Sequence, residues 1–421
     1  MRWTIFGLAT MLVTVIAVMA FFINADNGEV VQKQRYAKGL AVSAVASTPR
    51  AAPSPDFRGS ARSRPDPKDR FEPGEVIVLN PPKRFEAKIE KLRFTVLEKV
   101  SLPGLSSALY RLGTPPGKPV PVALKLLSSQ FSGLVADANH YFELQAGEEA
   151  SLSRLKVTAR MAAGWDKVSG SCGMGVKIGM VDASVDVTHP AFSGRNLRFI
   201  SFNRRDRKPG SAKHGTAIAA MLIGNKKWGG LLPGAELLAA NMFEVNAAGR
   251  TVGSALGLAK ALNWMVMSRV HAINLSIAGA DNKVMRRIFS KVTAKGITLV
   301  AAVGNKGWSD KRAYPAGYNG VLTVTAVGDG NRIYRRANMG NYIDFAAPGV
   351  KIWTAVPGGG ALQSGTSMAT PFVTALLALD IAFKRSPSPA KVLVRQAVDL
   401  GVRGKDPIFG WGRVKELPQC G

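Results

Sequence analysis

The hydrophobic pattern from about residue 170 to the C-terminus alternates between short apolar runs and longer segments whose apolar positions recur every three to four residues. Short runs bounded by glycine or polar residues predict buried strands, and the longer segments predict helices. The predicted strands are Val176–Asp182, Leu237–Met242, His271–Ile277, Ile297–Val303 and Val321–Val327. The predicted helices are His214–Ile223, Val252–Ser268, Lys283–Lys295, Ser367–Phe383 and Pro389–Asp399. Such alternation predicts an α/β fold with a mainly parallel sheet and helices on both faces.

An earlier block, residues 71–146, has a different order of elements. It reads as strand, helix, strand, strand, helix and strand over the segments Glu75–Leu79, Pro82–Lys91, Phe94–Val100, Ser107–Leu112, Pro121–Gln130 and Val135–Leu144. This βαββαβ order predicts a small ferredoxin-like α+β domain. A generic small α+β domain fits the same pattern, so the order alone assigns no role to the block.

An apolar run of bilayer-spanning length occupies Trp3–Ile23, within residues 1–25. Its place at the N-terminus and its lack of an amphipathic stripe favour a targeting segment over a core helix. A cleaved signal peptide and a retained anchor both stay open, because Ile23-Asn24-Ala25 is a poor cleavage site. We therefore expect an exported protein of the periplasm, the cell envelope or the medium, attached to a membrane through residues 3–23 if that segment is kept.

Residues 26–70 are rich in Ala, Pro, Ser and Arg and have no sustained apolar period. Such a stretch cannot bury enough apolar surface to offset the entropy of ordering it, which predicts a disordered linker.

The chain is strongly basic, with 56 Lys and Arg against 28 Asp and Glu and a formal charge of +28. A positive field of this kind attracts anionic surfaces such as lipid headgroups and envelope polymers. The basic residues are spread along the chain and are not interleaved with aromatic residues on one element, so we predict no nucleic-acid partner.

Cysteine occurs twice, at Cys172 and Cys420. The two can form a structural disulfide in an oxidising compartment. Neither lies in a catalytic-thiol motif, and two cysteines without histidines at ligand spacing do not make a zinc site.

Three short segments carry the candidate chemistry. They are Val181–Asp186, which contains Asp182 at a strand end, Lys213–Ala217, which contains His214 at a helix start, and Ser364–Pro371, which contains Ser367 at a helix start. Chymotrypsin-like enzymes carry their triad in the order His, Asp, Ser, and α/β-hydrolases in the order Ser, Asp, His. With its order Asp, His, Ser and the run Ser-Gly-Thr-Ser-Met-Ala-Thr-Pro, this sequence resembles the subtilisin-like (subtilase) serine peptidases. The sequence lacks the G-x-S-x-G elbow that an esterase of the α/β-hydrolase kind would need.

The resemblance implies a serine endopeptidase that works through an acyl-enzyme. Ser367 would be the nucleophile, His214 its general base, and Asp182 the group that orients the imidazole. The run Ala301–Asn305 ends in the Gly-Asn pair typical of the family, which makes Asn305 the candidate side-chain donor of the oxyanion hole.

The resemblance also suggests where a polypeptide substrate would bind. The segment Asn274–Gly279 resembles the family's cleft strand, which gives Ser276, Ile277, Ala278 and Gly279 as substrate-binding candidates. Ala301, Ala302 and Gly304 would line a pocket with room for an apolar or medium-sized side chain before the cut bond. Ala278 and Ser184 stand where the family commonly has glycine, which affects the expected specificity more than the chemistry.

The 71–146 block resembles the inhibitory propeptide of the same family. Val135–Leu144 is similar to the last propeptide strand, so this block is expected to inhibit the catalytic domain, residues 147–421, within the same chain. We therefore expect the chain to be made as a zymogen that cleaves itself between about Gln145 and Arg160. The alternative is a non-catalytic pseudo-peptidase, a binding module whose N-terminal block stays in the cleft.

The remaining titratable candidates favour structural roles. We predict that His189 and His271 are structural, that His140 belongs to the propeptide-like strand, and that Asp186 is a turn carboxylate. No cofactor is expected and no metal ligand is assigned, although relatives often bind structural calcium, because no ligand cluster is evident.

Overall fold

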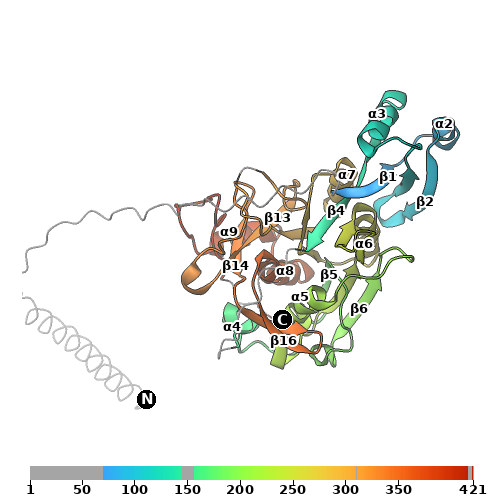
Figure 1. The fold of residues 1–421 in the computed structure, drawn as a ribbon. Helices are drawn as coiled ribbons and strands as arrows, with labels where there is room; N and C mark the ends of the chain where they lie inside the picture. The colour runs from blue at the N-terminus through green and yellow to red at the C-terminus, as the bar shows by residue number, and fades with distance from the viewer. Residues whose placement is uncertain (1–69, 145–155, 310, 416–419, 421) are drawn as a thin grey trace, which may run out of the picture. The chain divides into compact units, whose positions relative to one another are not determined.

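The computed structural model describes residues 70–144, 156–309, 311–415 and 420 (Figure 1). The predictions for residues 1–25 and for nearly all of the linker at 26–70 therefore lie outside the described residues, as does the expected boundary at residues 146 and 147. Within the described residues, no helix is long and apolar enough to cross a membrane.

A parallel sheet of seven strands forms the centre of the larger domain. Its strands, in spatial order, are β14 (Phe345–Pro348), β13 (Val321–Val327), β12 (Thr298–Ala302), β10 (Ala272–Leu275), β5 (Lys177–Asp182), β7 (Glu236–Asn241) and β6 (Asn196–Ser201). Every neighbouring pair in this sheet runs parallel. The predicted α/β fold with a mainly parallel sheet is confirmed.

Helices cover both faces of this sheet because successive strand side chains point to opposite sides. Val300 of β12 packs with α5 (Lys213–Ile223) and α8 (Thr366–Ala382), whereas its neighbour Leu299 packs with α6 (Ala255–Met267) and α7 (Lys283–Thr293). Both side chains are fully buried. The sheet is apolar on both faces, as expected for a buried parallel sheet.

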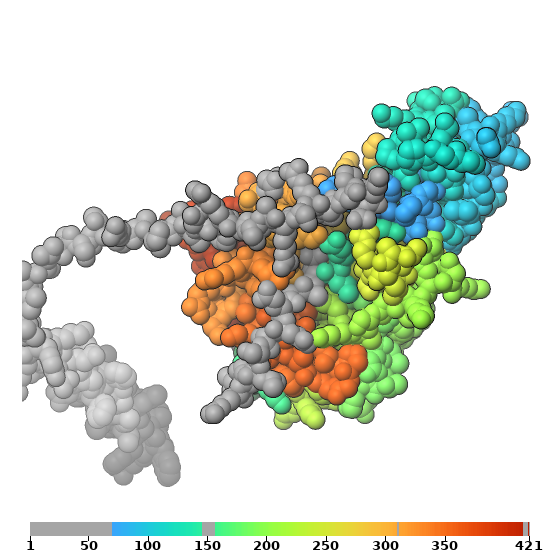
Figure 2. Space-filling model, viewed as in Figure 1, coloured from blue at the N-terminus to red at the C-terminus, as the bar shows by residue number. Residues whose placement is uncertain are grey.

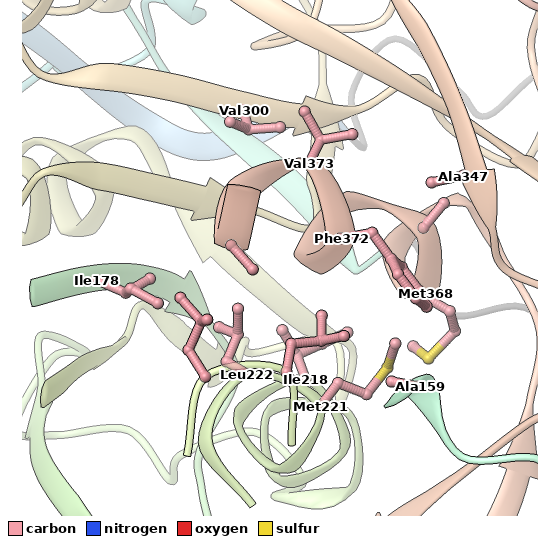
Figure 3. Close-up of a cluster of buried hydrophobic side chains, with 14 of the residues drawn as sticks. Ala159, Ile178, Ile218, Met221, Leu222, Val300, Ala347, Met368, Phe372 and Val373 are labelled. Atoms are coloured by element: carbon pink, nitrogen blue, oxygen red, sulfur yellow. The ribbon is translucent and has the colours of Figure 1, made fainter. Parts of the chain in front are cut away.

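Helices α5 and α8 pack directly against each other (Figure 3). Ile218 and Met221 of α5 face Met368 and Phe372 of α8 in one buried cluster, next to Ala159 of the short helix α4 (Ala159–Ala163). Close packing fixes the distance between the first turns of α5 and α8.

A second sheet begins in residues 71–144 and extends onto the larger domain through β4. Its strands from this block are β2 (Thr95–Leu102), β3 (Ser107–Gly113), β1 (Phe71–Leu79) and β4 (Val135–Leu144) in that spatial order, with α2 (Phe85–Lys91) and α3 (Val120–Gln130) packed on them. The element order along the chain is the predicted βαββαβ. The apolar positions of both helices, among them Phe85, Ile89 and Leu127, form a core of their own with β1.

Figure 2 shows this small domain as a blue and cyan lobe beside the yellow surface of α6. At that contact the backbone N–H of Gly104, in the turn η2 (Pro103–Leu105), donates to Asn263 Oδ1 at 2.9 Å. Lys260 of α6 pairs with Glu98 of β2.

Strand β4 connects the two domains. Beyond its pairing with β1, it pairs antiparallel with β9 (Thr251–Ser254), which pairs with β8 (Phe243–Val245), and with β11 (Ile277–Gly279). The remaining helical and strand segments, which lie outside these two sheets, are η3 (Pro190–Phe192), η4 (Lys226–Trp228), η5 (Asp329–Asn331), the hairpin β15 (Ile352–Val356) and β16 (Gly359–Gln363), and α9 (Pro389–Gln396).

Several predicted elements differ in extent: β1 begins four residues earlier than predicted, and α2 and α9 are each three residues shorter. Two further differences follow from pairing with β4. The predicted strand His271–Ile277 is broken at Ser276 into β10 and β11, because the chain leaves the parallel sheet there to pair with β4. The predicted helix Val252–Ser268 begins three residues later, because Gly253 and Ser254 pair with β4. The Ser254 hydroxyl then caps α6 by accepting from the N–H of Gly257 at 3.0 Å.

Candidate active site

Asp182 is the last residue of β5, at the carboxyl edge of the parallel sheet. Its side chain is completely buried, and its Oδ1 accepts the N–H of Ala183 and faces His214 Nδ1, both at 2.7 Å. Ligand and catalytic sites of open parallel sheets lie at this edge. A buried carboxylate held by a backbone N–H is well placed to fix one orientation of the imidazole.

His214 lies in the first turn of α5, facing that carboxylate. The next residue, Gly215, packs so closely on β5 that a Cβ atom there would overlap the carbonyl oxygens of Ala183 and Ser184. The glycine therefore lets the helix start approach the strand end, which brings the His214 ring into hydrogen-bond reach of Asp182.

Ser367 is the second residue of α8, and its Oγ lies 3.1 Å from His214 Nε2. The helix is preceded by Gly365, whose φ of 147° is a conformation that side-chain-bearing residues rarely adopt. Asp182, His214 and Ser367 thus form a continuous chain of two hydrogen bonds, although 185 positions separate the first and last of them (367 − 182). The contact between α5 and α8 brings the histidine and the serine together.

Asn305 follows β12 and Gly304, which has a φ of 104°. Its Oδ1 accepts two hydrogen bonds from Thr366, one from the backbone N–H at 3.1 Å and one from the hydroxyl at 2.9 Å. These bonds fix which end of the amide faces α8. The amide nitrogen, the end with donor hydrogens, is thereby turned away from Thr366.

A buried polar network fixes the main chain at Ser367, and only one of its members, Ser276, was identified from the sequence. Ser276 Oγ donates to the carbonyl oxygen of Ser367 at 3.3 Å, Asn274 donates to Ser276 Oγ at 3.0 Å, and Thr374 Oγ1 donates to Asn274 Oδ1 at 3.1 Å. Thr366 and Thr374 are both fully buried. Two features of the sequence could have indicated this network: Thr374, a polar residue within an otherwise apolar helix, and Thr366, directly before Ser367.

The structure places the other substrate-binding candidates in two groups. Ile277, Ala278 and Gly279 form β11, which pairs with Leu144, Glu143 and Phe142 of β4. Ala301 and Ala302 lie fully buried at the end of β12, and Val303 separates them from Gly304. Their roles as a substrate pocket stay predictions.

The remaining titratable candidates make local structural contacts. His189 accepts the N–H of Ala191, His271 accepts that of Lys177, and Asp186 accepts the N–H and hydroxyl of Thr188 in a turn. Burial and the nearby Lys177 charge lower the pKa of His271. Burial likewise lowers the pKa of His140, which lies on β4 beside Asn282.

Cys172 and Cys420 form a disulfide that closes a sequence separation of 248 residues. The described residues contain no group of three or more His, Cys, Asp or Glu side chains arranged to hold a metal ion.

Comparison with known sequences gives one family. A sequence model described as the Subtilase family matches residues 173–412. Curated relatives include the minor extracellular protease Epr of Bacillus subtilis, 29% identical over 60% of this chain, and a thermophilic serine proteinase of Bacillus sp. strain AK1, 32% identical over 59%. The aligned parts cover 39% and 62% of those relatives' own lengths, so the chain spans less than two thirds of either.

Solved structures agree on the fold. Fervidolysin from Fervidobacterium pennivorans, described as a keratinolytic enzyme related to subtilisin, matches 84% of this chain and 61% of its own length with a TM-score of 0.67 and 22% identity. The protease domain of PatA, solved as a mutant, matches 59% of this chain and 94% of its own length with a TM-score of 0.51 and 27% identity.

Proposed function

The chain belongs to the subtilase family, and from that premise we propose that it is a serine endopeptidase whose triad is Asp182, His214 and Ser367. The observation that carries the proposal is the unbroken pair of hydrogen bonds, 2.7 Å and 3.1 Å long, that joins these three side chains. Each of the three is at least nine-tenths buried, which excludes bulk water from the hydrogen bonds.

In the proposed reaction, His214 Nε2 takes the Ser367 hydroxyl proton while Oγ bonds to the carbonyl carbon of a peptide. The C–N bond then breaks, the imidazolium returns its proton to the departing amine, and an acyl ester remains on Ser367. Water, deprotonated by His214, hydrolyses that ester and restores the serine. Asp182 holds the imidazole and stabilises its charged form without taking the proton.

The oxyanion formed in both halves of this reaction needs hydrogen-bond donors. We assign this role to the Asn305 amide and the backbone N–H of Ser367 at the start of α8, where the helix dipole also favours negative charge. The two Thr366 bonds to Asn305 Oδ1 support this assignment, because they orient the donor end of the amide.

We further propose that residues 71–146 are an intramolecular inhibitor and that the chain matures by cutting itself between about Gln145 and Arg160. Support comes from β4, which pairs with β11 and β9 as an extended peptide substrate would. The same pairing fits the alternative function, a non-catalytic binding module in which the N-terminal domain stays in the cleft.

For localisation we propose export, to the periplasm, the cell envelope or the medium, with residues 1–25 as signal peptide or anchor. The relative Epr is named an extracellular protease. A disulfide between Cys172 and Cys420 fits an oxidising compartment.

The decisive experiment compares residues 26–421 as wild type and as Ser367→Ala, by intact mass and by labelling with a serine-reactive fluorophosphonate. We expect the wild type to lose a propeptide-sized fragment and to label, and the variant to do neither. A folded wild-type protein that stays full length and unlabelled, even after limited proteolysis removes the N-terminal domain, would instead establish the binding module. If purified Ser367→Ala still matured, self-cleavage would be wrong.

A further inference from the structure

Strand β4 has a defined register on the catalytic domain. Phe142 pairs with Gly279, Glu143 with Ala278, and Leu144 with Ile277. The residue before Ile277 is Ser276, which donates to the carbonyl of Ser367. Described residues of β4 therefore approach the nucleophile in the direction a substrate strand would take.

Phe142 and Glu143 are successive residues of β4, so their side chains point to opposite sides of the strand. Phe142 is completely buried between β9 and β11, and Gly279 leaves the room for its ring, since a Cβ atom at Gly279 would lie 2.8 Å from Phe142 Cδ1. Glu143 points the other way, with 52% of its side chain exposed. The buried ring fixes the register, and the next residue is presented to the surface.

Lys306 meets this outward-facing carboxylate. Its Nζ lies 2.5 Å from Glu143 Oε2, and its backbone follows directly on Asn305. The backbone N–H of Lys306 donates to the buried Asn338 Oδ1 at 3.1 Å, so the main chain at this position is fixed. Its ammonium also lies 5.4 Å from the centre of the Trp308 ring. The ammonium of Lys311 lies 4.0 Å from the centre of the same ring.

Lys306 directly follows Asn305, the proposed oxyanion donor. Its side chain therefore presents a positive charge to one position of an extended chain that pairs with β11. We propose that Lys306 is a specificity-determining residue that favours substrates with an acidic side chain at the position opposite Ala278, directly after a large apolar residue. This inference rests on the proposed peptidase function and names the class of polypeptide it prefers.

An exposed pair of this kind contributes a modest selectivity, because solvent screens it and two long side chains must be ordered. With 38% of the Lys306 side chain exposed, we expect a Glu substrate to exceed its Gln counterpart about two- to fivefold in kcat/KM. The preference should shrink in 1 M NaCl, where charges are screened within about 3 Å.

The test uses the self-matured full chain and three fluorogenic peptides with the sequence of residues 139–147. One keeps Glu at position 143, and the others carry Gln or Lys there. Active sites are counted by fluorophosphonate labelling, so each kcat/KM refers to competent enzyme.

We expect the order Glu, Gln, Lys for the wild type and the reverse order for Lys306→Glu, with Lys306→Arg close to wild type. Lys311→Glu is the matched control, since it reverses a charge over the same Trp308 ring, whereas the ion pair with Glu143 belongs to Lys306. Equal rates on all three peptides by a labelled enzyme would overturn the inference alone. An enzyme that neither labels nor cleaves any peptide would overturn the peptidase proposal and this inference with it.

Discussion

Glu72 and Arg207 form a bidentate ion pair between the N-terminal domain and the larger domain. Arg207 Nη2 donates to Glu72 Oε1 at 2.6 Å and Nη1 to Oε2 at 2.8 Å, with only about a tenth of either side chain exposed. Tyr141 of β4 donates to the same carboxylate at 2.8 Å, and Glu244 of β8 accepts from Arg207 at 3.0 Å. The interface that holds β4 against β9 and β11 therefore contains a buried, charge-paired network next to its apolar contacts.

This pair should make the stability of the uncleaved protein depend on pH. Burial raises the pKa of Glu72, but hydrogen bonds from Arg207 and Tyr141 and the charges of Arg207 and Arg204 outweigh it, and the pKa lies below its ordinary value of 4.5. A carboxyl whose pKa is lowered by folding stabilises the folded state above pH 4.5 and loses that contribution as the pH falls through the lowered pKa. The Ser367→Ala variant is expected to keep its N-terminal domain. We expect the urea concentration at its unfolding midpoint to decrease as the pH is lowered from 4.5 through the pKa of Glu72.

Glu72→Gln in the Ser367→Ala background should weaken this loss of stability at acidic pH. It should also lower the free energy of unfolding at pH 7 by about 2 kcal/mol, because Arg207 keeps Glu244 but loses its main partner. Glu86→Gln is the matched control, since Glu86 pairs with Lys99 on the exposed surface of the N-terminal domain. If both variants shifted the midpoint equally at every pH, the interdomain pair would carry no specific role.

Replacing Asn305 by Ala should slow catalysis without preventing nucleophile labelling. Removing one side-chain donor from a subtilisin-type oxyanion hole typically costs about 10²–10³ in kcat, and KM should change little because the donor acts mainly in the transition state. Steady-state kinetics on matured enzyme check this prediction. A change in KM with kcat preserved would assign Asn305 to ground-state binding instead.

Thr366 should act as a positioning residue for Asn305. Thr366→Val removes the hydroxyl that donates to Asn305 Oδ1 at 2.9 Å but keeps the backbone bond at 3.1 Å. We expect about a three- to tenfold loss in kcat with unchanged KM, and Thr366→Ser should restore it. Introduced into Asn305→Ala, the same valine should have no further effect on kcat, whereas a merely structural role would make the two losses add.

Gly215→Ala should damage both folding and activity, because its Cβ would overlap two backbone carbonyl oxygens and push α5 away from β5. We expect a loss of about 1–3 kcal/mol in the free energy of unfolding, typical of overpacking, together with lower kcat through a displaced His214. Gly170→Ala is the control, since no heavy atom lies within 4 Å of its added Cβ. Calorimetry and kinetics on the same samples separate the two effects, and a Gly215→Ala protein with wild-type stability and kcat would refute the close-packing argument.

Much of the fold could be predicted from periodicity, apart from helix ends and from places where distant segments pair. The limits of β13 and β4 match the predictions; α5 begins one residue earlier than predicted, and α8 begins and ends one residue earlier. The break at Ser276 and the strand at Thr251–Ser254 were not predicted, because both depend on hydrogen bonds to β4, more than a hundred residues earlier. Local patterns carry no information about such partners.

The sequence by itself determined which groups can do chemistry: Asp182, His214 and Ser367 stand in the subtilase order, each at a strand end or helix start, because those places follow from local periodicity and glycine. Only the tertiary structure decided which other side chains contact these groups and the segments around them. Four contacts join segments that are far apart in the chain. They are the packing of α5 on α8, the hydrogen bonds from Thr366 to Asn305, and the ion pairs of Lys306 with Glu143 and of Arg207 with Glu72. Their distances depend on how the packed core and the strand registers close, which no single segment encodes.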